Sequence, residues 1–258
     1  MFLKHKGINV FYSEKGSGKP VILLHGFLEN SSMWNDLATQ LSKEHQVISI
    51  DLLGHGQTEC LGYIHSMELM AEAVNAVLIH LKIEKATFVG HSMGGYVALA
   101  FAEKYSTKIE GLCLMNSTAQ ADNKERKLNR DRAIKVVKEN YKAFVSMSIA
   151  NLFAPENRDK LLNDILQIKN EALKTPLQGI VAALEGMKIR KDRTKLFKTL
   201  PFKKLLIIGL KDPVLDANSL KNHLQGSDVK IIEFSGGHMS HIENKEEFTY
   251  KILHFIEK

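Results

Sequence analysis

The stretch of sequence that decides the fold is residues 86–95, which read ATFVGHSMGG. Its first four residues form a largely apolar run typical of a strand in a parallel sheet, and the residues from 94 to 105 have helical spacing. The turn between them is Gly-X-Ser-X-Gly, with Ser92 at its centre between Gly90 and Gly94. Side chains at the two glycines would collide with backbone in so tight a turn, which holds the serine hydroxyl at the carboxyl end of the sheet. The pattern predicts a nucleophile elbow with Ser92 as nucleophile; the plainer alternative is a glycine-rich turn with an ordinary serine.

The rest of the chain alternates in the same way between short apolar runs and helical patterns. After an N-terminal β-hairpin, strands are predicted at 21–24, 47–50, 86–89, 109–115, 205–208 and 229–234. Helices are predicted at 31–43, 67–81, 94–105, 216–224 and 245–256. Strands that alternate with helices imply right-handed crossovers, and so an α/β fold with a mostly parallel sheet and helices on both faces.

The alternation stops between residues 118 and 198, where only helical periodicity is present. This predicts an inserted helical lid at 118–198, with 1–117 and 199–258 together forming the core domain. The lid region is also the basic part of the chain. Residues 122–200 hold 18 Lys+Arg and 10 Asp+Glu, a net charge of +8, whereas the whole chain carries +6. Because the lysines are dispersed, we interpret this charge as a solvated helical surface, with attraction of anionic substrates as the alternative.

Composition excludes several classes of protein. With 44% hydrophobic and 25% charged residues, the chain is typical of soluble globular proteins, and no apolar run is long enough to span a membrane. The N-terminal residues are charged and alternating, unlike a signal peptide. Cys60 and Cys113 make neither a disulfide framework nor a metal cluster, so we expect reduced thiols and a cytoplasmic location. No motif indicates a nucleic-acid or membrane partner, and the oligomeric state stays open.

A serine nucleophile needs a base, and two late histidines compete for that role. His238 follows a pair of glycines after the last predicted strand, on a loop free to reach across the sheet, whereas His241 begins the next turn or helix. We predict His238 as the base and His241 as a packing or hydrogen-bonding neighbour. A zinc site formed by these two with Glu243 is the remaining alternative, but no other ligand spacing accompanies them.

The base in turn needs an orienting carboxylate. Asp212 lies just past the strand at 205–208, and the order Ser92, Asp212, His238 is that of α/β hydrolases. Asp216 is the rival acid, with helix N-cap as its plainer role.

An oxyanion hole is the third requirement of this chemistry. One donor is expected to be the N–H of Met93, directly after the nucleophile. The other is expected from the loop after the strand at 21–24, where we assign the N–H of Phe27, with Leu28 as the alternative. His25 on the same loop is interpreted as a supporting residue and not as a second base.

Together these residues resemble the α/β-hydrolase family, and the likeness runs over the whole chain. The family's landmarks appear in order: HGF at 25–27, DLLGHGQT at 51–58, the elbow at 90–95, Gly209 to Asp212, and Gly237-His238. The second of these resembles the family's D-x-x-G-H-G-x-S segment, with Thr58 where serine is usual; it is a structural loop in such proteins, so His55 is not taken as catalytic. The resemblance implies an eight-stranded, mostly parallel sheet with a helical lid after the sixth strand.

The identity of the nucleophile narrows the activity that the resemblance implies. Family members that dehalogenate haloalkanes or open epoxides use an aspartate at the elbow, so Ser92 argues against both. We expect a carboxylic-ester hydrolase of small acyl substrates that works through an acyl-enzyme and needs no cofactor or metal. Alternatives at the same triad are a lactonase, a thioesterase or a carbon–carbon bond hydrolase, and a ligand receptor without catalysis is a further one.

The lid is expected to select the substrate. Lid side chains that are candidates to line a pocket over Ser92 are Phe144, Met147, Phe153, Leu184 and Met187; packing within the lid is their plainer role. Basic lid residues that would suit an anionic substrate are Lys188, Arg190, Lys191 and Arg193.

Overall fold

A computed structural model describes residues 1–258 and contains one eight-stranded sheet in the order β1-β2-β4-β3-β5-β6-β7-β8. The strands are β1 (Phe2–His5), β2 (Ile8–Lys15), β3 (Lys19–Leu24), β4 (His45–Ile50), β5 (Ala86–His91), β6 (Ile109–Met115), β7 (Lys203–Gly209) and β8 (Lys230–Phe234). The hairpin β1-β2 is antiparallel and β2 joins β4 antiparallel, whereas the pairs from β4 through β8 are parallel. The predicted mostly parallel α/β fold is confirmed.

Helices occur in the predicted order at the five positions expected outside residues 118–198. They are α1 (Asn35–Leu41), α2 (Met67–His80), α3 (Met93–Tyr105), α9 (Ala217–Leu224) and α11 (Lys245–Glu257). Two short helices were not predicted individually: α8 (Thr194–Thr199), which begins within the predicted lid, and α10 (Ser240–Glu243). Short 3-10 turns precede α1 at Ser31–Trp34 and precede β6 at Ser106–Lys108. No helix has the length and apolar character that a membrane crossing needs.

The parallel strands bury both faces, and alternate residues face different helices. On one side, Val21, Val89 and Ile207 belong to an apolar cluster that also contains residues of α1 and α11. On the other side, Ile22 and Phe88 belong to the larger cluster beneath α2 and α3. Because alternate side chains of a strand point to opposite faces, each face of the sheet packs against its own layer of helices.

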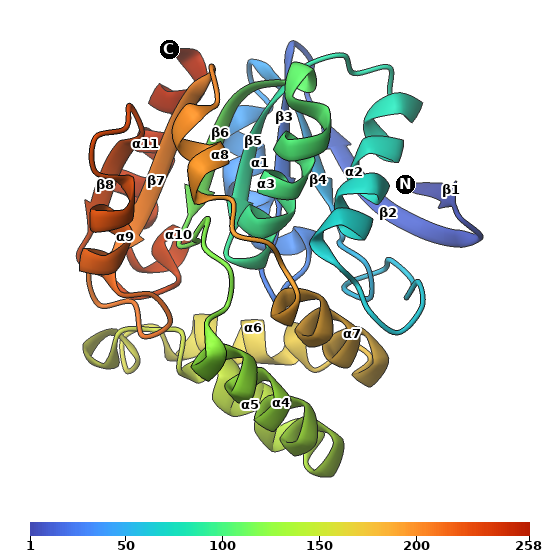
Figure 1. Ribbon diagram of the computed structural model, residues 1–258, viewed down its shortest axis with the longest axis vertical. Coiled ribbons are helices and arrows are strands. Elements are labelled where there is room, and N and C mark those ends of the chain that lie inside the picture. The colour runs from blue at the N-terminus through green and yellow to red at the C-terminus, as the bar shows by residue number, and fades with distance from the viewer.

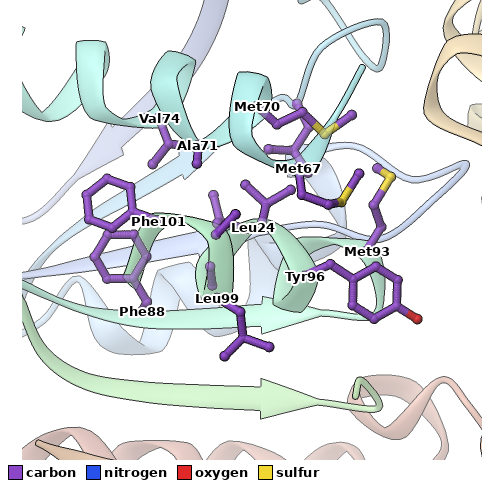
Figure 2. Close-up of a cluster of buried hydrophobic side chains, with 14 of the residues drawn as sticks. Leu24, Met67, Met70, Ala71, Val74, Phe88, Met93, Tyr96, Leu99 and Phe101 are labelled. Carbon is purple, nitrogen blue, oxygen red and sulfur yellow. The ribbon is translucent and has the colours of Figure 1, made fainter. Parts of the chain in front are cut away.

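The larger cluster is the packing that supports the elbow. Figure 2 shows side chains of α2 and α3 meeting side chains of β3 and β5, with the Phe88 ring close to the Phe101 ring. The ring centroids of these two phenylalanines are 4.6 Å apart. Met93, the first residue of α3, is fully buried in the same cluster. The residue after Ser92 is thus fixed by core packing.

Residues 116–199, between β6 and β7, contain no strand. Their helices are α4 (Lys124–Glu139), α5 (Tyr141–Ala150), α6 (Leu162–Ala172), α7 (Leu177–Lys188) and α8, with a 3-10 turn at Pro155–Asn157. Helices α4 to α7 gather beyond one end of the sheet, in the lower part of Figure 1, whereas α8 lies beside the sheet. We call α4 to α7 with their connections the helical segment; its division from the core as a separate lid domain stays a prediction.

Glycine allows the helical segment to approach the core closely. A Cβ atom at Gly179 in α7 would lie 2.0 Å from the carbonyl oxygen of Gly54, and one at Gly186 would lie 1.8 Å from that of His65. Any side chain at these two positions would therefore push α7 away from the core loops.

Candidate active site

Ser92 stands at the junction of β5 and α3 in a backbone conformation that an L-residue rarely adopts, with φ +48° and ψ −111°. Two glycines make this turn possible. A Cβ at Gly90 would lie 2.6 Å from the carbonyl carbon and oxygen of Gly94, and a Cβ at Gly94 would lie 2.2 Å from the carbonyl oxygen of Leu24. Strained φ/ψ values of this kind persist where the surrounding structure enforces them, commonly at functional sites.

Ser92, His238 and Asp212 form one hydrogen-bonded chain. The Ser92 Oγ lies 2.9 Å from His238 Nε2, and His238 Nδ1 lies 2.7 Å from Asp212 Oδ2. Because a carboxylate only accepts hydrogen bonds, the Nδ1–H donates to Asp212, which leaves Nε2 to accept from the serine hydroxyl. Three residues separated by 146 and 26 positions are thus brought together by the carboxyl ends of β5, β7 and β8.

The Asp212 carboxylate is held in its charged form. Its Oδ1 accepts from the backbone N–H groups of Val214 (2.8 Å) and Leu215 (3.0 Å), and its Oδ2 also accepts from the Asn116 side-chain amide (3.2 Å). Burial alone would raise the pKa of Asp212, but the contact with His238 and these donors lower it below its usual value. A fixed negative charge beside His238 suits a group that must stabilise an imidazolium.

The residues considered as alternatives to Asp212 and His238 make other contacts. Asp216 caps α9, where its side chain accepts from Ser219 N–H at 2.6 Å. The His241 ring lies between those of Trp34 and His91, with centroids 6.0 Å and 5.7 Å away, and burial lowers its pKa to about 3. The structure contains no cluster of three His, Cys, Asp or Glu side chains arranged to hold a metal ion.

The loop after β3 lies against Ser92. A Cβ at Gly26, the residue before Phe27, would lie 3.2 Å from the Ser92 Cβ. Met93 opens α3, where the first backbone N–H groups of a helix lack intrahelical partners. His25 supports this loop: its Nδ1–H donates to Gly26 O at 2.7 Å and its Nε2 accepts from Leu52 N–H at 2.8 Å. The roles of Phe27 and Met93 as oxyanion donors stay a prediction.

Several residues that were not predicted to support the triad hold the His238 loop. The His238 N–H donates to Leu152 O at 2.8 Å, and its carbonyl accepts from the His91 ring at 3.0 Å. The preceding Gly237 is held through its N–H by Glu243 (2.9 Å) and through its carbonyl by Asn116 (3.1 Å). His91 lies inside the elbow motif, but no local pattern signals the partner of its ring, 147 residues away.

The proposed pocket residues have different surroundings. Leu184 and Met187 are buried in the main core cluster, Phe153 is buried in a small cluster with Ile165 and Met239, Phe144 is partly buried, and Met147 is 64% exposed. A cavity of about 280 Å³ lies between α6, α10, α11 and residues 28–37, and none of these five residues lines it. Their part in substrate binding remains a prediction.

The basic residues at the end of the helical segment are engaged by carboxylates. Buried Arg190 pairs with Asp122 at 2.6 Å, and buried Arg193 reaches both Glu68 (2.6 Å) and Glu103 (2.7 Å). Lys188 pairs with Asp131 (2.6 Å) and Glu185 (2.7 Å), whereas Lys191 is 64% exposed and 3.8 Å from Glu103. These cations neutralise neighbouring carboxylates, which weakens the case that they attract an anionic substrate.

Known proteins share this architecture. A family model described as the alpha/beta hydrolase fold matches residues 19–245. The structure of a thermophilic esterase from Thermogutta terrifontis superposes with a TM-score of 0.89 at 30% sequence identity, covering 99% of this chain and 96% of that one.

Two curated relatives differ in how much of their length is matched. A 3-oxoadipate enol-lactonase from Acinetobacter baylyi is 25% identical, with the alignment covering 97% of this chain and 93% of that protein. An uncharacterized protein from Mycobacterium tuberculosis is 38% identical over 102 residues, which are 40% of this chain and only 30% of that protein's length.

Proposed function

The chain belongs to the α/β hydrolase fold family, and from this premise we propose that it is a serine hydrolase that cleaves carboxylic esters of small acyl groups. The single observation that carries the proposal is the chain of hydrogen bonds from Ser92 Oγ through His238 to Asp212, at 2.9 Å and 2.7 Å. The esterase of Thermogutta terrifontis, 30% identical over nearly the whole chain, supports the same reaction class.

Each half of the proposed reaction uses His238 twice. In acylation, His238 Nε2 takes the proton of Ser92 as the hydroxyl attacks the ester carbonyl, and then gives that proton to the leaving alcohol. In deacylation, water loses a proton to His238, attacks the acyl-enzyme and releases the acid, and the proton returns to Ser92 Oγ. Asp212 keeps the ring in the tautomer with Nδ1–H and stabilises the imidazolium. The N–H groups of Phe27 and Met93 receive the negative charge of the tetrahedral intermediates.

Lactone hydrolysis is the second candidate. A lactone is a cyclic ester, so the same attack and the same oxyanion apply, with the leaving alcohol tethered to the acyl group. The observation that favours it is the relationship to the enol-lactonase of Acinetobacter baylyi over nearly the whole length of both chains.

The first experiment compares wild type with Ser92→Ala on p-nitrophenyl acetate, p-nitrophenyl butyrate and a five-membered lactone. We expect turnover by the wild type, and a loss of kcat on the order of 10³-fold or more in Ser92→Ala. Ser49→Ala is the control because Ser49, a buried serine in β4, makes no hydrogen bond to His238 or Asp212. A folded wild type that turns over none of these substrates would contradict the esterase and lactonase proposals together and favour a thioesterase, a carbon–carbon bond hydrolase or a ligand receptor.

A further inference from the structure

The residue before Ser92 contacts two hydrogen-bond acceptors at once. His91 Nδ1 lies 2.7 Å from Glu29 Oε2, and its Nε2 lies 3.0 Å from the backbone carbonyl oxygen of His238. Both side chains are buried, with 1% of the His91 and 3% of the Glu29 side chain exposed. The same Glu29 oxygen also accepts from Gly26 N–H at 2.6 Å, so the carboxylate is fixed on the loop that follows β3.

These contacts define the protonation state of His91. The His238 carbonyl oxygen accepts from Nε2–H, and an ionised Glu29 carboxylate accepts from Nδ1–H, so beside a charged Glu29 both ring nitrogens carry protons and His91 is an imidazolium. The pKa values of the pair agree with this state. Burial alone would lower the pKa of His91, but the charge of Glu29 raises it, and the charge of His91 lowers the pKa of Glu29 to about 2 against the effect of burial.

The other groups that face His91 leave it as the cation of this cluster. The His241 ring centroid lies 5.7 Å from that of His91, and His25 is near enough to interact with the charge of His91; burial lowers the pKa of both rings, that of His241 to about 3. The ring centroid of His238 lies 5.1 Å from that of His91, and Asp212 is hydrogen-bonded to the His238 ring. Beside an ionised Glu29, a neutral His91 would lose its hydrogen bond either to this carboxylate, which would keep only the Gly26 N–H, or to the His238 carbonyl, and such a loss is costly in a buried site.

We propose that His91 is a positioning residue: as an imidazolium held by Glu29, it fixes the backbone of His238 and thereby the His238 ring between Ser92 and Asp212. The inference rests on the proposed function above. His238 follows Gly236 and Gly237, which give the loop no stiffness of their own. His91 is the residue directly before Ser92 in the chain. Its hydrogen bond to the His238 carbonyl therefore links the backbone of the proposed base to the backbone of the proposed nucleophile.

The kinetic test uses Glu29→Gln, His91→Phe and His91→Gln on p-nitrophenyl acetate between pH 5 and 10. In His91→Phe we expect kcat to fall about tenfold or more with KM within about twofold, since positioning of the base is lost and substrate binding is not. His91→Gln keeps one N–H donor and should recover part of kcat. Glu29→Gln removes the charge that holds the His91 proton, so the loss of kcat with rising pH should begin at lower pH than in the wild type.

A matched control separates positioning from general destabilisation. His65 is also fully buried, with its Nε2 accepting from Leu61 N–H at 3.1 Å, and it contacts no part of the His238 loop. His65→Gln is expected to change the melting temperature but not kcat, KM or the pH profile. Wild-type kcat and an unshifted pH profile in Glu29→Gln would overturn the proposal, and this variant retains the shape of the side chain if His91→Phe fails to fold.

NMR provides readouts that need no substrate. In the full chain labelled with ¹⁵N-histidine, the His91 ring, assigned by its absence from His91→Gln, should show both nitrogens protonated at pH 7; a neutral ring would overturn the proposal. The low-field proton signal of His238 Nδ1–H should broaden in Glu29→Gln and persist in His65→Gln, and an unchanged signal in both would overturn it. If the wild type shows no Ser92-dependent turnover, the proposed function fails while these signals still decide the positioning role.

Discussion

The carboxylate of Glu243 accepts a hydrogen bond from the side-chain amide of Asn157 at 2.8 Å, across 86 residues of sequence. The same carboxylate accepts from Ala154 N–H at 3.0 Å and from Gly237 N–H at 2.9 Å. One side chain of α10 therefore joins the helical segment to the loop that carries His238. The position of the proposed base depends on where the helical segment is docked.

Replacement of Glu243 by glutamine tests the contribution of these hydrogen bonds. The amide has one acceptor oxygen where the carboxylate has two, so at least one of the donors on Gly237, Ala154 and Asn157 loses its partner. We expect the free energy of unfolding to fall by about 1–3 kcal/mol and kcat to fall with it. Urea denaturation and ester hydrolysis measure the two effects. Glu246→Gln, at an exposed position in α11, is the control and should change neither.

Gly94 is predicted to be intolerant of alanine. Its Cβ would meet the carbonyl oxygen of Leu24 at 2.2 Å, and that oxygen belongs to a central strand that cannot move freely. We expect Gly94→Ala to destabilise the protein by about 1–3 kcal/mol or to prevent folding, measured by thermal denaturation. At Gly111 the added Cβ would meet only the flexible Lys203 side chain, so Gly111→Ala should cost much less. Equal stability of the two variants would contradict the steric account of the elbow.

His55 should make stability depend on pH in the acidic range. Burial first, and then the charge of His25, lowers the pKa of His55 in the folded chain to about 3, against 6.5 as its ordinary value. Its contribution is therefore present above about pH 6.5 and is lost as the pH falls toward 3, because the unfolded chain binds the proton first. His55→Gln should lower the slope of unfolding free energy against pH by about 1.4 kcal/mol per unit near pH 4.5.

Urea denaturation at a series of pH values measures that slope. His223→Gln, at an exposed histidine of α9, is the control and should leave the slope as in the wild type. A slope in His55→Gln that equals that of the wild type would show that His55 does not take up a proton on unfolding.

Asp212→Asn tests the orientation of the proposed base. An asparagine amide would donate toward His238 Nδ1 and favour the wrong tautomer, so we expect kcat for ester hydrolysis to fall by about 10³–10⁴-fold with the fold intact. Asp216→Asn is the matched control, because Asp216 only caps α9 and asparagine is an equally good cap. A similar loss of activity in both variants would remove the distinction between the two aspartates.

Local sequence patterns were sufficient for most of the fold. The apolar runs predicted at 86–89 and 205–208 are the cores of β5 and β7, which extend by two residues or fewer at either end, and the strand at 109–115 matches β6 residue for residue. The predicted helix at 31–43 is instead a 3-10 turn followed by the shorter α1. Buried residues occur in both the 3-10 turn (Trp34) and α1 (Leu37), so the apolar pattern is continuous through 31–43. The pattern does not show that the helix type changes from 3-10 to α between them.

The sequence by itself determined the elbow at Ser92, the order of Ser92, Asp212 and His238, and the alternation that builds the sheet, because each of these residues and strands is marked by the residues directly around it. Only the tertiary structure decided how the His238 loop is held. Its partners His91, Glu243 and Leu152 come from β5, α10 and the helical segment, and their side chains and backbone meet only after the sheet and helices have packed. Long-range contacts between buried polar groups leave no periodic signal in the sequence, so the partners of His91 followed from the structure alone.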